Sequence, residues 1–528
     1  MASTRCRANV TSIVGTSKQE SSATSLYFSN ACERMCPRPT LRQDKGFAWF
    51  ILAMSFLSHA LHLGFTYAVI GNLTVIHQSL FGIDLQLSSF IGSVHAGVLF
   101  LFAPVASVLV KKLRCRATEI LGGLCLILGI GLSYFSSQPW HAFLLFGLLG
   151  GIGVSCVYVA SSEVLALNFT KYKYLAFSIA VLGYYGGMVA FPIVSQKLFD
   201  LFGYNHAMAI MASFHVVHLL AGCVFYQPSG EGEKSERSSL SEAKSALHEE
   251  TAKEKDRSPK NDKTEIPLFK VNTPEENLPQ EVQLQSNFQD PQALPPVSPD
   301  SEKELMESGT TNLKDDFKIL LASPKIWAML FNGLLWNINV ASFFILVTDF
   351  ALQATGINKD EAAFGVTIVG ITNIAGCLLV ISVSALRFDR LMLHFTCTLV
   401  YGITTVVMAF SSNKAMFYAM VGLWGLAQGA SIANLLGVLD NFCGVKQLAL
   451  LFGLYLFAEG FGALGGPPLC GYVSDKVGIR YGLILAGCAG IAGSLCILPV
   501  IIKQLQGQLR NGSKRQYSIT TSASDEKI

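Results

Sequence analysis

Apolar stretches of about 20 residues recur along most of this chain, and they limit what it can fold into. A helix of that length crosses the hydrocarbon core of a bilayer, which is about 30 Å thick. Backbone groups in lipid must be satisfied within the protein, so helices are the expected form. Charged residues make up only 14% of the chain, against roughly 25% in soluble proteins. The sequence therefore predicts an all-α protein that crosses a membrane several times.

The apolar segments form two groups of six. The first group covers roughly residues 47–70, 87–110, 118–135, 140–165, 174–196 and 206–226. The second group covers roughly residues 326–349, 362–386, 391–410, 415–439, 447–473 and 481–502. They predict two six-helix bundles, residues 44–226 and 325–502. Twelve transmembrane helices in two halves match the design of the major facilitator superfamily.

Three polar regions flank and separate the two bundles. We expect a disordered N-terminal tail at 1–43, a disordered linker at 227–324 and a charged C-terminal tail at 503–528. The linker holds 20 acidic and 12 basic residues, a net charge of −8. The whole chain carries +3, so the rest carries +11. Such an excess of basic residues is typical of a membrane protein with positive cytoplasmic loops.

The short loops indicate an orientation. If the N-terminus is inside, the cytoplasmic short loops hold nine Lys and Arg residues and the opposite loops hold five. The positive-inside rule then places both termini and the linker in the cytoplasm. Because the N-terminal region lacks the apolar core of a signal peptide, the plasma membrane is the default location.

Glu459 is the clearest ionisable group in the middle of a predicted span, with no other charge nearby in the sequence. Ionisable groups at that depth are rare and are functional candidates by default. One interpretation is a protonatable or gating group in a central cavity. The other is a structural carboxyl that hydrogen-bonds between helices, and the residues alone leave both open.

Buried amides and histidines raise a similar choice. The candidate amides for lining a cavity are Asn337, Asn339, Asn373 and Gln428. Each could bind a polar solute or join neighbouring helices. Histidines in the first half, at positions 59, 62, 95, 215 and 218, could relay protons or serve as hydrogen-bonded packing residues.

Signatures of other functions do not stand out from chance. The glycine-rich runs lie within apolar segments and lack the pattern of a nucleotide-binding loop. No nucleophile, metal-ligand or nucleic-acid pattern is evident. We therefore predict a protein that is not an enzyme and has no cofactor, no metal and no nucleic-acid partner.

Several stretches, taken in order, resemble the monocarboxylate transporter family of the major facilitator superfamily. Two of them lead into the first and fifth segments, and their matching residues are Asp44, Gly46, Trp49, Lys171, Lys173 and Gly183. A third covers 459–475, and a fourth covers 351–376. Lys45 departs from the glycine that is usual there. The resemblance covers both bundles but neither tail nor the linker.

The resemblance implies a secondary carrier that works by alternating access, and a single-span glycoprotein chaperone as a partner. Proton-coupled lactate carriers of this family use a lysine in helix one. They also use an aspartate and, four residues later, an arginine in helix eight. The corresponding positions here are Gly71, Asn373 and Cys377, so all three charges are missing. Tyr67 aligns with an aromatic residue of the family's helix-one site.

The sequence thus predicts a solute carrier that moves a small organic solute across the plasma membrane. The solute is monocarboxylate-like, zwitterionic or neutral, and coupling to protons by symport stays open. A carboxylate solute would be strongly disfavoured in a buried site without a cation. The alternative, from another class, is a non-transporting receptor or scaffold derived from such a carrier, with its linker and tails as docking sites.

Overall fold

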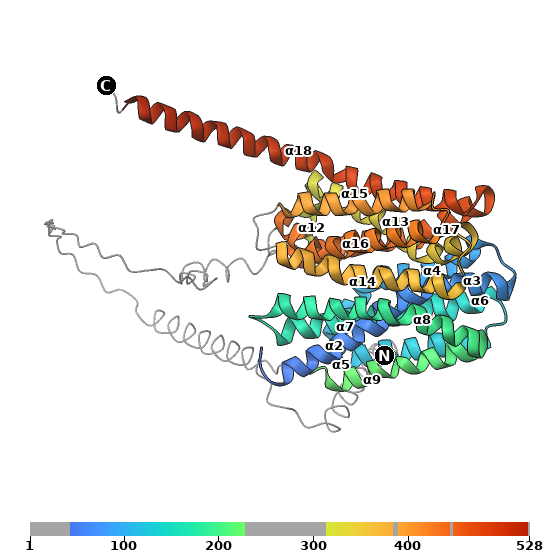
Figure 1. Ribbon diagram of the computed structural model, residues 1–528. Helices are drawn as coiled ribbons and strands as arrows, with labels where there is room; N and C mark the ends of the chain where they lie inside the picture. The colour runs from blue at the N-terminus through green and yellow to red at the C-terminus, as the bar shows by residue number, and fades with distance from the viewer. Residues whose placement is uncertain (1–42, 227–312, 384–388, 444–446, 526–528) are drawn as a thin grey trace, which may run out of the picture. The chain divides into compact units, whose positions relative to one another are not determined.

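The computed structural model describes residues 43–226, 313–383, 389–443 and 447–525, and the regular elements among them are helices (Figure 1). Residues 1–42 of the expected N-terminal tail and 227–312 of the expected linker lie outside this part of the chain.

The first half contains the helices before the linker, which run from blue to green in Figure 1. They are α2 (Phe47–His59), η1 (Ala60–Gly64), α3 (Phe65–Phe81), α4 (Leu85–Leu101), α5 (Ala103–Leu132), η2 (Ser133–Phe135), α6 (Pro139–Ala142), η3 (Phe143–Gly150), α7 (Gly151–Asn168), α8 (Lys173–Phe214) and α9 (Val216–Val224). Elements η1 and η3 are π-helical and η2 is a 3₁₀ turn.

The second half contains the helices after the linker, which run from yellow to red in Figure 1. They are α12 (Leu313–Ala322), α13 (Pro324–Ala354), α14 (Lys359–Val383), α15 (Arg390–Met408), α16 (Lys414–Cys443), α17 (Leu448–Val477) and α18 (Ile479–Asp525).

Ten helical stretches among the described residues are long and apolar enough to cross a membrane. Two of them bend at a residue with non-helical backbone angles, α5 at Arg114 and α8 at Gly203. The part of α5 before Arg114 continues α4, and the part of α8 after Gly203 continues into α9. Divided at these bends, the helices are consistent with the twelve spans that the sequence predicts, in two groups of six.

Helices extend beyond the bundle boundaries that the sequence indicates. Residues 313–322, within the expected linker, form α12, because Leu313, Phe317 and Leu320 recur at helical spacing. At the other end α18 continues past position 502 to Asp525. Both extensions are amphipathic or charged, which explains why hydropathy alone places them outside the bundles.

Asp44 ties the entry of the first helix to the loop before α8. Its carboxylate accepts hydrogen bonds from the Thr170 hydroxyl at 2.6 Å and from the backbone N–H groups of residues 170, 171 and 172 at 3.1–3.3 Å. The Thr170 hydroxyl, with the backbone N–H groups beside it, lowers the pKa of the Asp44 carboxyl to about 2. Asp44 therefore stays ionised and holds this loop at neutral pH.

Glycine allows α2 and α8 to approach closely. A Cβ atom on Gly183 would meet the carbonyl group of Phe56, with the carbonyl carbon at 2.9 Å. One turn later Gly187 packs in the same way against Ala60 and Gly64. Without a hydrophobic driving force between helices in lipid, such close packing is a main source of helix association.

The hydrogen bonds between the two halves gather at one end of the bundles. Gln78 Nε2 donates to Asp349 Oδ2 at 3.2 Å, and Lys197 Nζ lies 2.7 Å from Asp360 Oδ2. Asp475, near the end of α17, accepts from the first two backbone N–H groups of α4 at 3.1 and 2.8 Å. That carboxylate also suits the positive end of the α4 dipole.

The remaining hydrogen bonds between the halves lie at the same end or near mid-helix. They join Ser89 to Pro467, Thr348 to Asn72, Thr367 to Val189 and Asn373 to Met188. At the opposite end, where α2 begins and α14 ends, no hydrogen bond joins the halves in the described part of the chain.

We expect Gly183→Ala to lower the free energy of unfolding by about 1–3 kcal/mol, because the added methyl group overpacks the contact with Phe56. Gly186→Ala is the matched control, since a Cβ atom there has nothing within 4 Å. Thermal unfolding of the purified chain in detergent measures both. An equal effect of the two variants would contradict the close approach of α2 and α8.

We expect Asp44→Asn to lower the melting temperature at neutral pH. The folded-state pKa of Asp44 is depressed, so its stabilising contribution is present above the ordinary value near 3.8 and is lost as the pH falls through about 2. The difference in melting temperature between wild type and variant should therefore shrink over that range. A difference that stays constant down to pH 2 would show that the charge of Asp44 is not what stabilises the loop.

Candidate functional site

Glu459 lies on α17 and is buried at 7% exposure. The side-chain amide of Asn337, on α13, donates a hydrogen bond to the backbone oxygen of Glu459 at 3.0 Å. Five tyrosines from both halves lie within electrostatic range of the carboxyl, namely Tyr67, Tyr158, Tyr184, Tyr401 and Tyr455. The carboxyl is thus buried within the protein, where tyrosines of both halves are near enough to interact with it electrostatically.

Tyr67, Tyr184 and Gln428 continue this site across both halves. The rings of Tyr67 (α3) and Tyr184 (α8) lie 6.1 Å apart, centroid to centroid. The Tyr184 hydroxyl lies close enough to the side chain of Gln428, on α16, to interact with it. The Gln428 Oε1 atom is buried without a protein partner among the described residues. The structure therefore brings four predicted candidates together: Tyr67, Asn337, Gln428 and Glu459.

Asn339 is not part of this group. Its amide nitrogen donates to the Ala486 backbone oxygen at 2.9 Å and to Thr405 Oγ1 at 3.2 Å. Its oxygen accepts from Trp424 Nε1 at 3.4 Å. These partners lie on α18, α15 and α16, so Asn339 joins helices inside the second half.

Asn373 and Gly71, the positions at which the family resemblance led us to expect charged groups, are both closely packed. Asn373, on α14, is fully buried against α8, with Nδ2 3.9 Å from Met188 Sδ and Oδ1 without a protein partner among the described residues. A Cβ atom on Gly71 would come within 2.8 Å of Thr348 Oγ1 on α13. A lysine at Gly71 would therefore separate α3 from α13.

Cations are missing from the interior of the described helices. Among the Asp, Glu, Lys and Arg side chains of these helices, those that are fully or nearly buried are the carboxyls of Glu119, Asp349 and Glu459, and none is a Lys or an Arg. A group of three His, Cys, Asp or Glu side chains able to hold a metal ion is also lacking in the described residues.

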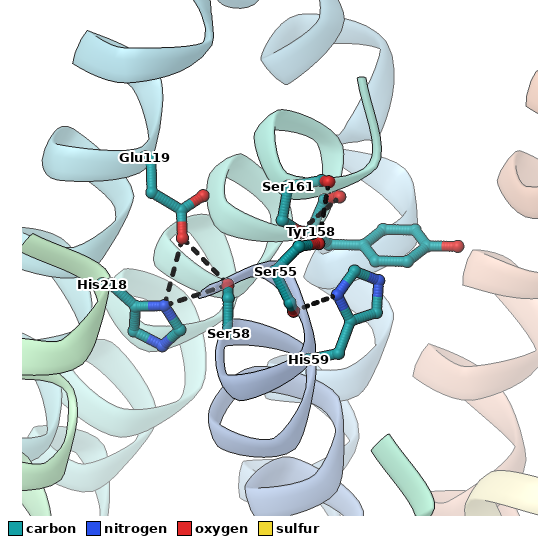
Figure 2. Close-up of polar contacts among 7 residues, drawn as sticks. All are labelled: Ser55, Ser58, His59, Glu119, Tyr158, Ser161 and His218. Atoms are coloured by element: carbon teal, nitrogen blue, oxygen red, sulfur yellow. Dashed lines mark hydrogen bonds and ion pairs between the residues drawn. The ribbon is translucent and has the colours of Figure 1, made fainter. Parts of the chain in front are cut away.

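A second polar cluster lies within the first half, and sequence reasoning missed its central residue, Glu119. Figure 2 shows Glu119 of α5 facing Ser58 of α2 and His218 of α9. Glu119 Oε1 lies 2.9 Å from Ser58 Oγ and 3.2 Å from His218 Nδ1, and Ser58 Oγ lies 3.3 Å from the same nitrogen. All three side chains are fully buried. The signal was present, since Glu119 falls inside the predicted third span, but it follows Arg114 and Arg116 and so resembles a loop end.

The family-signature residues meet in space, at the entry to the bundle. The Trp49 ring packs edge-on against the Phe169 ring, with their centroids 5.4 Å apart. It also lies 6.2 Å, centroid to centroid, from the ring of Tyr172, which is the residue between Lys171 and Lys173 in the sequence. Gly46 has a φ of +53°, which favours glycine there. The two signature stretches therefore pack together around Asp44. Gly183 lies further along α8, where it packs against Phe56.

Comparisons with known proteins agree with this architecture. The family model for the Major Facilitator Superfamily matches residues 47–394 and 342–520. Monocarboxylate transporter 12 of Mus musculus is 24% identical over 469 residues, 88% of this chain and 87% of that protein. Monocarboxylate transporter 6 of Mus musculus is 25% identical over 465 residues, 86% of each chain.

Among solved structures, a crystal structure of a mutant of the peptide transporter POT in complex with sulfate is similar in fold. It has a TM-score of 0.60 and 13% sequence identity, and the match covers 88% of this chain and 97% of that chain. Family model, relatives and fold are those of transporters, and the alternative of a receptor or scaffold finds no support. The chain therefore belongs to the Major Facilitator Superfamily, as a multi-pass membrane solute carrier that is similar to the monocarboxylate transporters.

Proposed function

We propose that this carrier binds a small neutral or zwitterionic organic solute between its two halves, at Glu459, Gln428, Tyr67 and Tyr184. The observation that carries the proposal is the charge of the site. A buried carboxyl stands among tyrosines and amides, and the described helices bury no Lys or Arg.

This charge pattern selects the solute. An ammonium group would compensate Glu459 and could also lie against the faces of the tyrosine rings. Polar groups of a neutral solute would pair with Gln428, whose Oε1 is otherwise without a partner in the described chain. A carboxylate alone would meet a carboxyl and no cation, which is unfavourable in a buried site.

The relatives' name nevertheless points to monocarboxylates. A zwitterion reconciles the two, because it contains a carboxylate and carries its own compensating cation. We further propose that Asn373 takes the solute's carboxylate end through its amide, in place of the missing charges.

We propose that transport proceeds by alternating access. In one step of the cycle the two halves separate at the end where hydrogen bonds now join them. With the N-terminus in the cytoplasm, as we propose, this end would face outward, and the hydrogen bonds there would hold the carrier closed on the outer side. The ion pair of Lys197 and Asp360 would then break when the carrier opens outward. We also retain the plasma membrane as the location, both termini in the cytoplasm, and a single-span glycoprotein chaperone as a partner suggested by the family resemblance.

Uptake by expressing cells tests the solute class. We expect uptake of labelled zwitterions, such as carnitine or tryptophan, to exceed uptake of lactate and pyruvate. Glu459→Gln should lower zwitterion uptake about tenfold or more, because a hydrogen bond to a charged group contributes roughly 1.5–3 kcal/mol. Glu163→Gln, on the exposed end of α7, is the matched control and should transport normally.

Two results would count against the proposal. Efficient lactate uptake by wild type that survives Glu459→Gln would exclude a site built around this carboxyl. Equal activity of Gln428→Leu and wild type would remove Gln428 from the binding site. Installing the family's charges with Asn373→Asp and Cys377→Arg should shift uptake toward lactate.

Cross-linking tests the moving end. The double variant Lys197→Cys/Asp360→Cys can be cross-linked with a short reducible reagent. We expect the cross-linked carrier to show only background uptake, because the cross-link fastens the two halves together. Lys414→Cys with Glu361→Cys is the control, since these residues form an ion pair within the second half. Full uptake in the cross-linked Lys197–Asp360 pair would contradict opening at this end.

A further inference from the structure

The cluster of Glu119, Ser58 and His218 has no role in the solute site described above. All three side chains belong to the first half, and their contacts with one another lie between α2, α5 and α9. Ionisable side chains buried in a membrane protein are costly and mark functional sites by default. The cluster therefore requires an explanation beyond packing.

Its hydrogen bonding is incomplete. Glu119 Oε2 and His218 Nε2 are buried without a protein partner among the described residues, although the facing atoms of both groups are paired. Buried polar groups with a purely structural role are normally satisfied, and each unsatisfied one costs about 1–3 kcal/mol. By contrast, His95 uses both ring nitrogens, one with Thr66 and one with the Phe146 backbone oxygen.

A second observation comes from the helix that carries Ser58. Just after it, α2 changes into the π-helical turn η1, Ala60–Gly64. Single π-helical turns in α-helices are frequently found at functional sites. This turn carries His62, and both of its ring nitrogens are buried without a protein partner in the described chain. The π-helical turn thus places a second unsatisfied imidazole beside the cluster.

The titratable groups continue from the cluster toward Glu459. The His62 ring lies 6.2 Å from the His218 ring and 5.8 Å from the Tyr158 ring, centroid to centroid. Tyr158 is partly exposed and lies within electrostatic range of Glu459. Figure 2 shows Tyr158 directed away from Glu119, on the far side of Ser55 and His59. The distances between these rings are too long for direct hydrogen bonds, so a proton would pass from one ring to the next through intervening water.

We propose that Glu119, Ser58 and His218 form a proton-binding site that couples solute transport to a proton gradient, with His62 and Tyr158 connecting it to the solute site at Glu459. The inference rests on the proposed carrier function. A proton enters on the carboxyl or the imidazole, the two groups share it through the contact at 3.2 Å, and it leaves on the other side after the carrier changes conformation. No other bond is made or broken.

The surroundings favour a proton over other ligands. The described residues offer no set of three ligands for a metal ion. Within the described ranges, the facing groups are imidazoles, thiols and a phenol, and a second carboxylate is not among them. From the packed elements they are His59 on α2, His62 on η1, His95 on α4, Cys125 on α5, Cys156 and Tyr158 on α7, and His215 between α8 and α9. Arg116 lies one turn before Glu119, with its guanidinium 5.3 Å from the Tyr226 ring centre.

Accumulation by proteoliposomes tests the coupling. With one proton carried per solute, an interior one pH unit more alkaline should drive about tenfold accumulation of labelled carnitine by wild type. We expect Glu119→Gln to abolish accumulation and yet to keep carnitine counterflow, which needs a folded carrier but no proton movement. His218→Asn should behave in the same way. Glu163→Gln and His206→Asn, both at exposed positions, are the matched controls.

A measurement without solute separates this inference from the proposed function. The infrared difference spectrum of the purified chain between acid and alkaline buffer should contain a buried carboxyl band that is lost in Glu119→Gln and kept in Glu163→Gln. Presence of this band supports the proton site even if carnitine is not carried. Wild-type accumulation by Glu119→Gln, or an infrared spectrum unchanged by that substitution, would overturn it.

Discussion

Lipid offers no partners to polar groups, so each polar side chain of this protein must find its partner inside the bundle or remain without one. Some buried groups of the second half meet this requirement fully. His394 lies between Asn332 Oδ1 at 3.2 Å and Ser431 at 3.1 Å, and Asn339 joins three helices. Against such a background, unsatisfied groups are informative. Gln428, Asn373, His62 and Glu119 each keep a buried atom unpaired in the described chain, as do several residues outside the proposed sites, such as His77.

The same constraint shapes the contacts within and between the two halves. Within each half, glycine contacts and buried hydrogen bonds hold the helices together. Between the halves, the ion pair of Lys197 and Asp360 is 55% and 53% exposed, and exposed pairs contribute only about 0–1 kcal/mol. Other contacts between the halves are buried, such as those of Ser89 with Pro467 and of Gly71 with Thr348, and they resemble the contacts inside each half. The exposed ion pair is therefore the weakest of the polar links between the halves, and in the proposed transport cycle it is the first expected to break.

The sequence predicts the helical class, the two halves and most spans, because runs of about 20 apolar residues have few other solutions in a membrane. It does not separate Asn337 from Asn339, because two residues along a helix turn the side chain by roughly 200° and no periodic pattern marks which face is internal. It also misses Glu119, whose partners Ser58 and His218 are 61 and 99 residues away in the chain. Contacts of that kind exist only after the helices pack.

The buried carboxyls of the two proposed sites, Glu119 in the first half and Glu459 in the second, also suggest how solute and proton influence each other. Charges in a protein interior interact over long distances, with about 1 kcal/mol between unit charges roughly 15 Å apart at an effective dielectric constant near 20. A cation bound beside Glu459 therefore changes how readily Glu119 and His218 take a proton, and the proton changes solute affinity by the same factor. The tyrosines between them, Tyr158 above all, are polar but uncharged, so they transmit this interaction without neutralising it. The proposed coupling then needs no shared residue for solute and proton. It needs only that both sites face the same side at the same time.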